Sequence, residues 1–324
     1  MKTILKTLLT SALLVLFYLS AATQITNSSG TFQQKEVVLE TATGSIYGQL
    51  MLPDSKTPVS LVIIIAGSGP TDMDCNNPMF KTNSYKYLAE DLVKNNIASL
   101  RFDKRGIAKS KDAVVSESDL HFENYVVDVV DWIKLMKEES SFSRIFILGH
   151  SEGSLIGMLA AEKIEVAGFI SVAGVGKPAS EVIREQLKAQ PPMVLQDAEP
   201  IIESLLAGKT VTEVKPYLSS LFRPSVQPYM ISWFKYNPAD EIKNLNIPVL
   251  IVQGTTDIQV ETEHANILHE AAKNSELKVI EGMNHILKDA PASRQLNMAT
   301  YGQTDLPLNT EFPGVVEDFI RKNK

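Results

Sequence analysis

Short apolar runs alternate with helical patterns along most of the chain. Two β-like segments, 37–40 and 45–52, flank a turn at Gly44 and predict an antiparallel pair. Six further apolar runs predict buried strands, and they cover 59–66, 97–103, 144–148, 167–172, 248–253 and 277–281. Helical patterns separate most of these runs, at 84–95, 122–139 and 151–163. Repeated strand–helix units predict an α/β fold, a doubly wound and mostly parallel eight-stranded sheet with helices on both faces.

One long stretch, 176–244, breaks this alternation. Its helical patterns are interrupted by prolines and include no clear strand; they cover 179–190, 197–206 and 214–221. We interpret the stretch as a helical cap inserted after the sixth core strand, where it would roof a site. The core would then comprise residues 35–175 and 245–324. Within the second part, a loop is expected over 290–309, before a final helix at 313–321.

The first residues have the pattern of a secretion signal. A basic start precedes an apolar run over 8–19 and small residues that end at Ala22. This order predicts a signal peptide over 1–22, and therefore a secreted or periplasmic protein. The run is short for a membrane span, so no stable membrane anchor is expected, with an uncleaved anchor as the alternative. A flexible leader is expected over 23–34.

A glycine-flanked pentapeptide, Gly149-His150-Ser151-Glu152-Gly153, joins a strand-like run to a helical run rich in small residues. G-x-S-x-G between a strand and a helix is the nucleophile-elbow pattern, in which a tight turn exposes the serine Oγ above a helix N-terminus. The flanking glycines suit a turn that is too tight for side chains. The alternative is a chance match in a glycine turn, and the two flanking elements argue against it. We predict that Ser151 is a nucleophile.

Two further residues follow strand ends in the order that this pattern requires. Asp257 comes after the seventh predicted strand and His285 after the eighth. The chain order Ser, Asp, His is that of the α/β-hydrolases. His285 would act as the general base toward Ser151, and Asp257 would orient the imidazole. The alternatives are that Asp257 is an ordinary turn aspartate and that Asp289 is a distant substitute for it.

A glycine-rich turn, Gly67-Ser68-Gly69-Pro70, follows the central strand predicted at 59–66. In sites of this kind the loop after that strand gives one backbone N–H to the developing oxyanion, and the residue after the nucleophile gives the other. The predicted donors are Ser68, with Gly69 as the alternative, and Glu152. The turn has neither of the glycine spacings that indicate a phosphate-binding loop.

From about residue 45 to the C-terminus, the chain resembles the bacterial α/β-hydrolases of the EstD-like carboxylesterase group. The segments that carry the resemblance are Gly67 to Asp72, Phe102 to Gly106, Gly149 to Gly153, Gln253-Gly254 before Asp257, and Gly282 to His285. The resemblance implies an acyl hydrolase with a Ser-Asp-His triad and no metal or organic cofactor. The chain departs from the family pattern in two loops, where Met73 and Cys75 replace an arginine and a glycine, and Ala108 replaces a glycine.

Composition narrows the class of protein. A chain of 324 residues with 44% hydrophobic and 21% charged residues can bury one large core, as single α/β domains do. The net charge of −7 and the scattered basic residues argue against a nucleic-acid partner. Cys75 is the single cysteine, so no disulfide forms within the chain.

We therefore expect a serine esterase whose partner is a small or medium carboxylic ester; the oligomeric state is left open. The same triad serves peptidases, thioesterases and lactonases, because the pocket sets the substrate. A prolyl-type exopeptidase of this fold would need an amine-binding carboxylate in the cap, where four glutamates are available: Glu181, Glu185, Glu199 and Glu203. The third interpretation is a non-catalytic binding protein, although such proteins usually lose a member of the triad.

Overall fold

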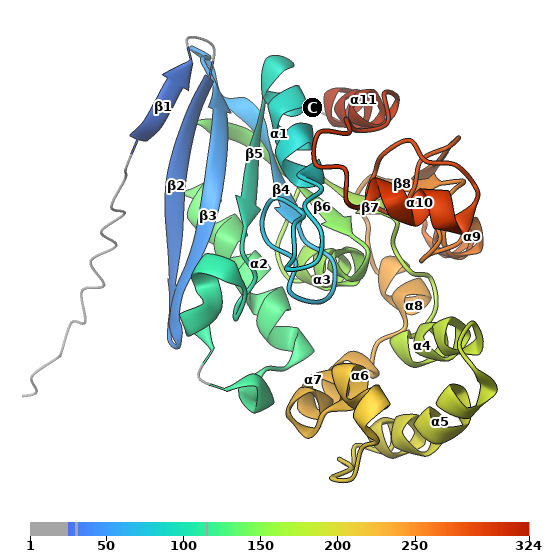
Figure 1. The fold of residues 1–324 in the computed structure, drawn as a ribbon. Helices are drawn as coiled ribbons and strands as arrows, with labels where there is room; N and C mark the ends of the chain where they lie inside the picture. Colours follow the sequence, from blue (N-terminus) through green and yellow to red (C-terminus); the bar gives the residue numbers. More distant parts are fainter. Residues whose placement is uncertain (1–24, 30–31, 115, 324) are drawn as a thin grey trace, which may run out of the picture.

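The computed structural model describes residues 25–29, 32–114 and 116–323 (Figure 1). Their strands form one sheet in the order β1-β2-β3-β5-β4-β6-β7-β8-β9. The strands β4 to β9 are parallel, whereas β1, β2 and β3 add to one edge by antiparallel pairing. The strand bounds are β1 Ile25–Ser29, β2 Phe32–Thr41, β3 Gly44–Pro53, β4 Val59–Ile65, β5 Ile97–Phe102, β6 Phe142–His150, β7 Gly168–Val172, β8 Val249–Gly254 and β9 Ser275–Ile280. The predicted mostly parallel, doubly wound sheet is confirmed.

The middle of the sheet is the most apolar part of the core. Every residue of β4 is buried, because this strand pairs with β5 on one side and β6 on the other while helices cover both faces. Its Ile63 lies beside Leu100 of β5 and Ile147 of β6. This register aligns the ends of β4 and β6, so the loops that follow them meet at one edge of the sheet.

Helices cover the two faces of the sheet (Figure 1). The helices α1 (Ser84–Lys94) and α11 (Phe312–Lys322) pack with one apolar cluster, and α2 (Phe122–Lys137), α3 (Glu152–Ala161) and α9 (Thr262–Ala271) pack with the other. In α11, four apolar residues at helical spacing turn toward the sheet; they are Phe312, Val316, Phe319 and Ile320.

Helices and turns alone make up the chain between β7 and β8, as the proline-rich pattern predicted. They are α4 (Ala179–Lys188), α5 (Pro192–Leu206), η3 (Pro216–Leu218), α6 (Ser219–Phe222), η4 (Pro224–Val226), α7 (Gln227–Trp233) and α8 (Pro238–Ile242). Residues of α4 to α7 form an apolar cluster of their own, which includes Ile202, Phe222 and Met230. In Figure 1 these helices lie together on one side of the sheet. The division into a core and a separate cap stays a prediction.

Two sequence predictions are wrong. The expected leader over 23–34 contains β1, which pairs with β2, and it contains the start of β2 itself, so the sheet has nine strands instead of eight. The start of β2 reads Phe-Gln-Gln-Lys, and its strand conformation depends on pairing with β3, not on an apolar run. The loop expected over 290–309 contains α10 (Arg294–Thr300), whose buried residues, Asn297 and Thr300, are polar and gave no helical periodicity.

The predicted signal peptide over 1–22 lies outside the described residues. Among those that are described, none of the helices is both long enough and apolar enough to cross a membrane.

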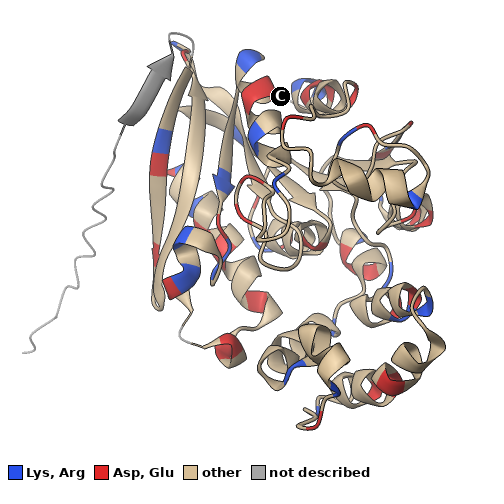
Figure 2. Cartoon of the chain, viewed as in Figure 1, with Lys and Arg blue, Asp and Glu red and all other residues tan. Residues whose placement is uncertain are grey.

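Charged residues of both signs are interspersed over the elements of the structure (Figure 2). Many form ion pairs at the surface, such as Lys177 with Glu185 at 2.9 Å and Lys243 with Asp240 at 2.7 Å. The negative net charge is therefore spread along the chain.

Candidate active site

The predicted elbow lies between β6 and α3. Ser151 has φ 54° and ψ −120°, a conformation that residues with a side chain rarely adopt. A Cβ on Gly149 would lie 2.2 Å from the Gly153 carbonyl oxygen, and a Cβ on Gly153 would lie 2.4 Å from that of Ile65. Both glycines are therefore required by close backbone contacts. The serine N–H donates to the Val172 carbonyl at 2.9 Å, which ties the turn to β7.

Asp257 and His285 are joined by a direct hydrogen bond. Asp257 follows β8 and His285 follows β9, and the two parallel strands bring the loops together. The distance from His285 Nδ1 to Asp257 Oδ2 is 2.8 Å, and both side chains are buried. The other oxygen of Asp257 accepts the backbone N–H groups of Gln259 at 2.8 Å and Val260 at 2.9 Å.

These contacts keep Asp257 ionised. Burial alone would raise the pKa of the carboxyl, but the charge of His285, its hydrogen bond and the two backbone N–H groups outweigh burial, so the pKa is lowered. A carboxylate can only accept, which places the proton of His285 on Nδ1. Nε2 is then the nitrogen available to take a proton from a hydroxyl.

Asp289, the distant substitute, is not part of this arrangement. Its side chain is exposed and accepts a hydrogen bond from Asn309 Nδ2 at 2.5 Å. Ser151 and His285, in contrast, line one cavity together with Ser68. The structure thus brings the predicted residues to one place, while their roles in catalysis stay predictions.

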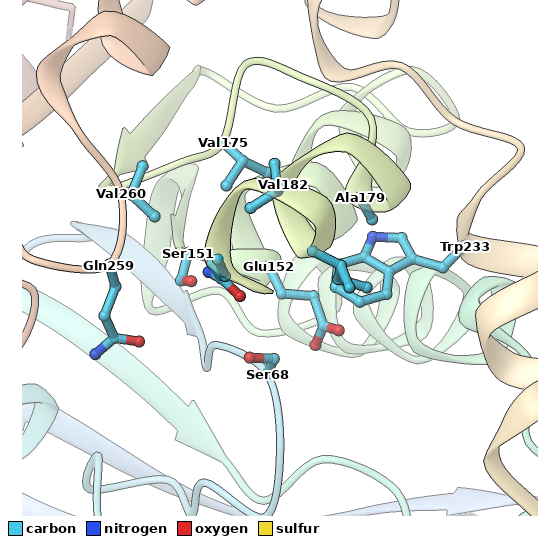
Figure 3. Close-up of a pocket in the computed structure, with 11 residues that line it drawn as sticks. Ser68, Ser151, Glu152, Val175, Ala179, Val182, Trp233, Gln259 and Val260 are labelled. Atoms are coloured by element: carbon cyan, nitrogen blue, oxygen red, sulfur yellow. The ribbon is translucent and has the colours of Figure 1, made fainter. Parts of the chain in front are cut away.

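Both predicted oxyanion donors border Ser151. Glu152 is the first residue of α3, so its N–H has no partner within the helix. Gly67 packs against the serine, since a Cβ on this glycine would lie 3.2 Å from the Ser151 Cβ, and this contact brings the start of the Ser68 turn to the elbow. Neither the Ser68 nor the Glu152 N–H has a hydrogen-bond acceptor within 32–114 or 116–323. In Figure 3, Ser68 lies on the opposite side of the pocket from Val175 and Val182.

Two cavities meet at Ser151, and they share Ser68 and Gln259. The first, of about 140 Å³, is lined by polar residues, among them Glu152 and Gln186, and by six apolar residues: Val175, Ala179, Val182, Ile183, Trp233 and Val260 (Figure 3). The second, of about 200 Å³, contains His285, and its lining also mixes polar residues with aromatic ones, including Thr71, Asn77, Thr82, Phe80, Tyr85 and Tyr301. Ser151 therefore faces two cavities, and the second of them contains His285.

His150, which the sequence pattern left as the variable position of the elbow, connects the loops around the site. Its Nε2 lies 2.8 Å from the His285 carbonyl oxygen, and its Nδ1 lies 2.7 Å from the Tyr85 hydroxyl. Because a carbonyl can only accept, Nε2 carries the proton and Nδ1 accepts from Tyr85. The Tyr85 oxygen in turn accepts the Gly67 N–H at 3.2 Å. No sequence signal indicated this network, which depends on residues from four separate segments.

His150 should make stability depend on pH. Burial and the nearby His285 charge lower the pKa of His150 to about 3, whereas the ordinary value is 6.5. Between these values the unfolded chain binds one proton more than the folded chain, so stability falls as the pH drops from 6.5 toward 3, by about 1.4 kcal/mol per pH unit. Urea unfolding of the wild type and of His150→Gln, repeated at pH values from 7 to 4, measures how the free energy of unfolding depends on pH. The variant should have the flatter profile, and equal slopes would contradict the assignment.

Two of the three replacements in the family pattern, at Cys75 and Ala108, lie where the backbone is left-handed. Cys75 has φ 72° and Ala108 has φ 45°, both in the region that glycine adopts most easily. The first loop is held by Asp72, whose carboxylate accepts the N–H groups of Asp74 at 2.9 Å and Asn76 at 2.8 Å. The two replacements therefore occupy turns of the kind that a glycine would form.

The chain is similar in sequence to one protein family and to two characterised enzymes. Residues 81–226 match the family described as "Serine aminopeptidase, S33". Over 271 residues the chain is 27% identical to the esterase EstD of Thermotoga maritima, a match that covers 79% of this chain and 60% of that protein. Over 251 residues it is 27% identical to human monoglyceride lipase, covering 72% of this chain and 78% of the lipase.

Solved structures share the fold. The α/β-hydrolase GrgF from Penicillium sp. sh18 superposes with a TM-score of 0.60 at 19% identity, covering 90% of this chain and 98% of that one. Est1E from Butyrivibrio proteoclasticus, solved with ferulic acid bound, gives a TM-score of 0.58 at 19% identity, covering 86% and 95%.

The chain has the α/β-hydrolase fold of these solved structures. Within that class it resembles the EstD-like carboxylesterases, as its segments predicted. The chain spans about 60% of the length of EstD itself.

Proposed function

We propose that this protein is a serine carboxylesterase that cleaves small to medium carboxylic esters through an acyl-enzyme. The observation that carries the proposal is the buried 2.8 Å bond between His285 Nδ1 and Asp257 Oδ2, beside a cavity that holds both His285 and the strained Ser151. An ordinary turn aspartate would not need a histidine partner. A binding protein would not need the elbow conformation, whose strain is typical of reactive serines.

The chemistry follows from the atoms that face the cavity. Ser151 Oγ attacks the ester carbonyl carbon while His285 Nε2 takes its proton. The Ser68 and Glu152 N–H groups stabilise the oxyanion, and the N-terminus of α3 adds its positive dipole. The imidazolium then gives its proton to the departing alcohol. Water activated by the same histidine releases the acid.

The position of His285 gives the substrate a direction. The leaving alcohol must lie beside the group that protonates it, so it should occupy the larger cavity, which contains His285. The acyl chain should occupy the smaller cavity, against its apolar side chains Val175, Val182 and Trp233. The small volume of this cavity favours short acyl chains.

Val182 should determine which acyl chain length the enzyme prefers. In wild type we expect p-nitrophenyl butyrate to be cleaved faster than the octanoate. Val182→Ala should raise the octanoate-to-butyrate ratio of kcat/KM about 10-fold, because methylene groups in an apolar pocket discriminate by about that factor. The matched control is Val127→Ala, since Val127 is half exposed on α2 and should leave the ratio unchanged. An unchanged ratio in Val182→Ala would place the acyl chain elsewhere.

The proposed function itself is tested by the hydrolysis of p-nitrophenyl acetate, butyrate and octanoate together with labelling by a fluorophosphonate probe. We expect turnover of the short esters and stoichiometric labelling. A folded protein that shows neither would overturn the proposal in favour of a binding protein.

An exopeptidase is the second candidate, because the matching family is described as a serine aminopeptidase. Three of the four cap glutamates that could bind a substrate amine are already paired, Glu185 with Lys177 and both Glu199 and Glu203 with Arg184. None of the four lines either cavity at Ser151 in the part of the chain that the structure describes. These contacts favour the esterase. Cleavage of amino-acyl p-nitroanilides without cleavage of esters would favour the peptidase.

A further inference from the structure

A buried lysine next to the elbow has no part in the chemistry derived above. Lys104 lies just after β5 and is 2% exposed. Its Nζ donates to the Gly67 carbonyl oxygen at 2.6 Å and to Glu152 Oε2 at 3.0 Å. It also lies 4.8 Å from the centre of the Tyr125 ring. Lys104 does not line either cavity at Ser151 within the described ranges, so it is not placed to touch a substrate.

The bond to Gly67 fixes the direction of the first oxyanion donor. The Gly67 carbonyl and the Ser68 N–H belong to one planar trans peptide, so they point in opposite directions. Holding the carbonyl toward Lys104 therefore turns the Ser68 N–H away from Lys104. On its other side, the Gly67 N–H is held by the Tyr85 hydroxyl at 3.2 Å. A charged donor on the carbonyl also polarises the peptide, which strengthens its N–H as a donor.

The same ammonium holds the residue that carries the second donor. Glu152 is 4% exposed, and its other carboxylate oxygen accepts the Tyr229 hydroxyl at 2.6 Å, a contact from α7. A buried carboxylate and ammonium are tolerated because each pairs with the other and with further hydrogen bonds. The side chain of Glu152 is therefore fixed, while its backbone N–H lies at the first position of α3, where it has no partner within the helix.

We propose that Lys104 is the positioning residue of the oxyanion hole: one buried ammonium holds both the peptide that carries the Ser68 N–H and the residue that carries the Glu152 N–H. This inference rests on the proposed esterase function. If Lys104 has this role, it stabilises the transition state, in which the oxyanion forms, and does not contribute to ground-state binding of the ester.

The test is Lys104→Met, which keeps an apolar stem of similar length and removes the ammonium. We expect kcat on p-nitrophenyl butyrate to fall about 10- to 100-fold, less than or similar to the loss of a whole oxyanion donor, with KM within about 2-fold of wild type. The affinity for a trifluoromethyl ketone, which forms a tetrahedral oxyanion adduct with the serine, should fall by the same factor as kcat/KM. A purely structural role would change the melting temperature without this match.

Lys109→Met is the matched control, since Lys109 lies five residues further along the chain, in the short helix η1 (Ala108–Ala113), and is exposed at the surface. Its kinetics should equal those of wild type. If Lys104→Met fails to fold because Glu152 is left charged and unpaired, Lys104→Met/Glu152→Gln removes both charges and takes its place.

Wild-type kcat and wild-type ketone affinity in the folded lysine variant, single or double, would overturn the inference and leave the esterase function standing. A change confined to KM would overturn it as well. Absence of ester turnover and of fluorophosphonate labelling in the wild-type protein would overturn the proposed function, and the inference with it.

Discussion

Ser151→Ala should abolish ester hydrolysis, with kcat lowered by at least about 10⁴-fold. The variant keeps the backbone donors and the cavities but has no oxygen to form the acyl-enzyme, so only the small acceleration that comes from binding and the oxyanion donors remains. His285→Ala should cause a loss of the same order, because the serine alcohol is a weak nucleophile without its base. The double variant should be no worse than either single one, since the two residues act as a unit.

The measurement is steady-state hydrolysis of p-nitrophenyl butyrate beside fluorophosphonate labelling, which Ser151→Ala should lose entirely. Ser220→Ala is the control, because Ser220 is exposed on α6 and should behave as wild type. More than about 1% of wild-type kcat in purified Ser151→Ala would exclude Ser151 as the nucleophile.

Asp257→Asn should lower kcat about 10³- to 10⁴-fold while leaving the fold intact. An asparagine amide can donate to Nδ1 of His285, which favours the tautomer whose Nε2 carries the proton and cannot accept one from Ser151. The expected effect on KM is small, because Asp257 does not line either cavity at Ser151 among the described residues.

Asp289→Asn provides the comparison for this prediction. Asp289 is also an aspartate in the loops after the last strands, but it is exposed and bonds to Asn309. Its variant should keep kcat within about 2-fold of wild type, in line with the small effects of most surface substitutions. A larger loss in Asp289→Asn than in Asp257→Asn would reverse the assignment that the 2.8 Å bond to His285 supports.

Most of the local structure could be predicted from the sequence, because it depends on neighbours in the chain. Apolar runs such as Val59–Ile65 are buried on both faces wherever they lie in the sheet, so their hydrophobicity alone predicts a central strand. The elbow motif is also contained in consecutive residues, and Gly149 is required by a contact within the turn, with Gly153, whereas Gly153 is required by a contact with Ile65 of β4. The order of Ser151, Asp257 and His285 was readable for the same reason, as each follows its own strand.

The sequence by itself determined the strand and helix periodicity, the elbow and the order of the predicted triad, since each is written within a few consecutive residues. The tertiary structure alone decided two further features. The elements β1 and α10 form although their sequences lack an apolar pattern. The two cavities at Ser151 are lined by segments that are far apart in the chain. Lys104 meets Gly67 and Glu152, and His150 meets Tyr85 and the His285 carbonyl, only when the loops converge. Polar groups buried at such a point must find partners, and which partners they find is set by the packing of the whole sheet.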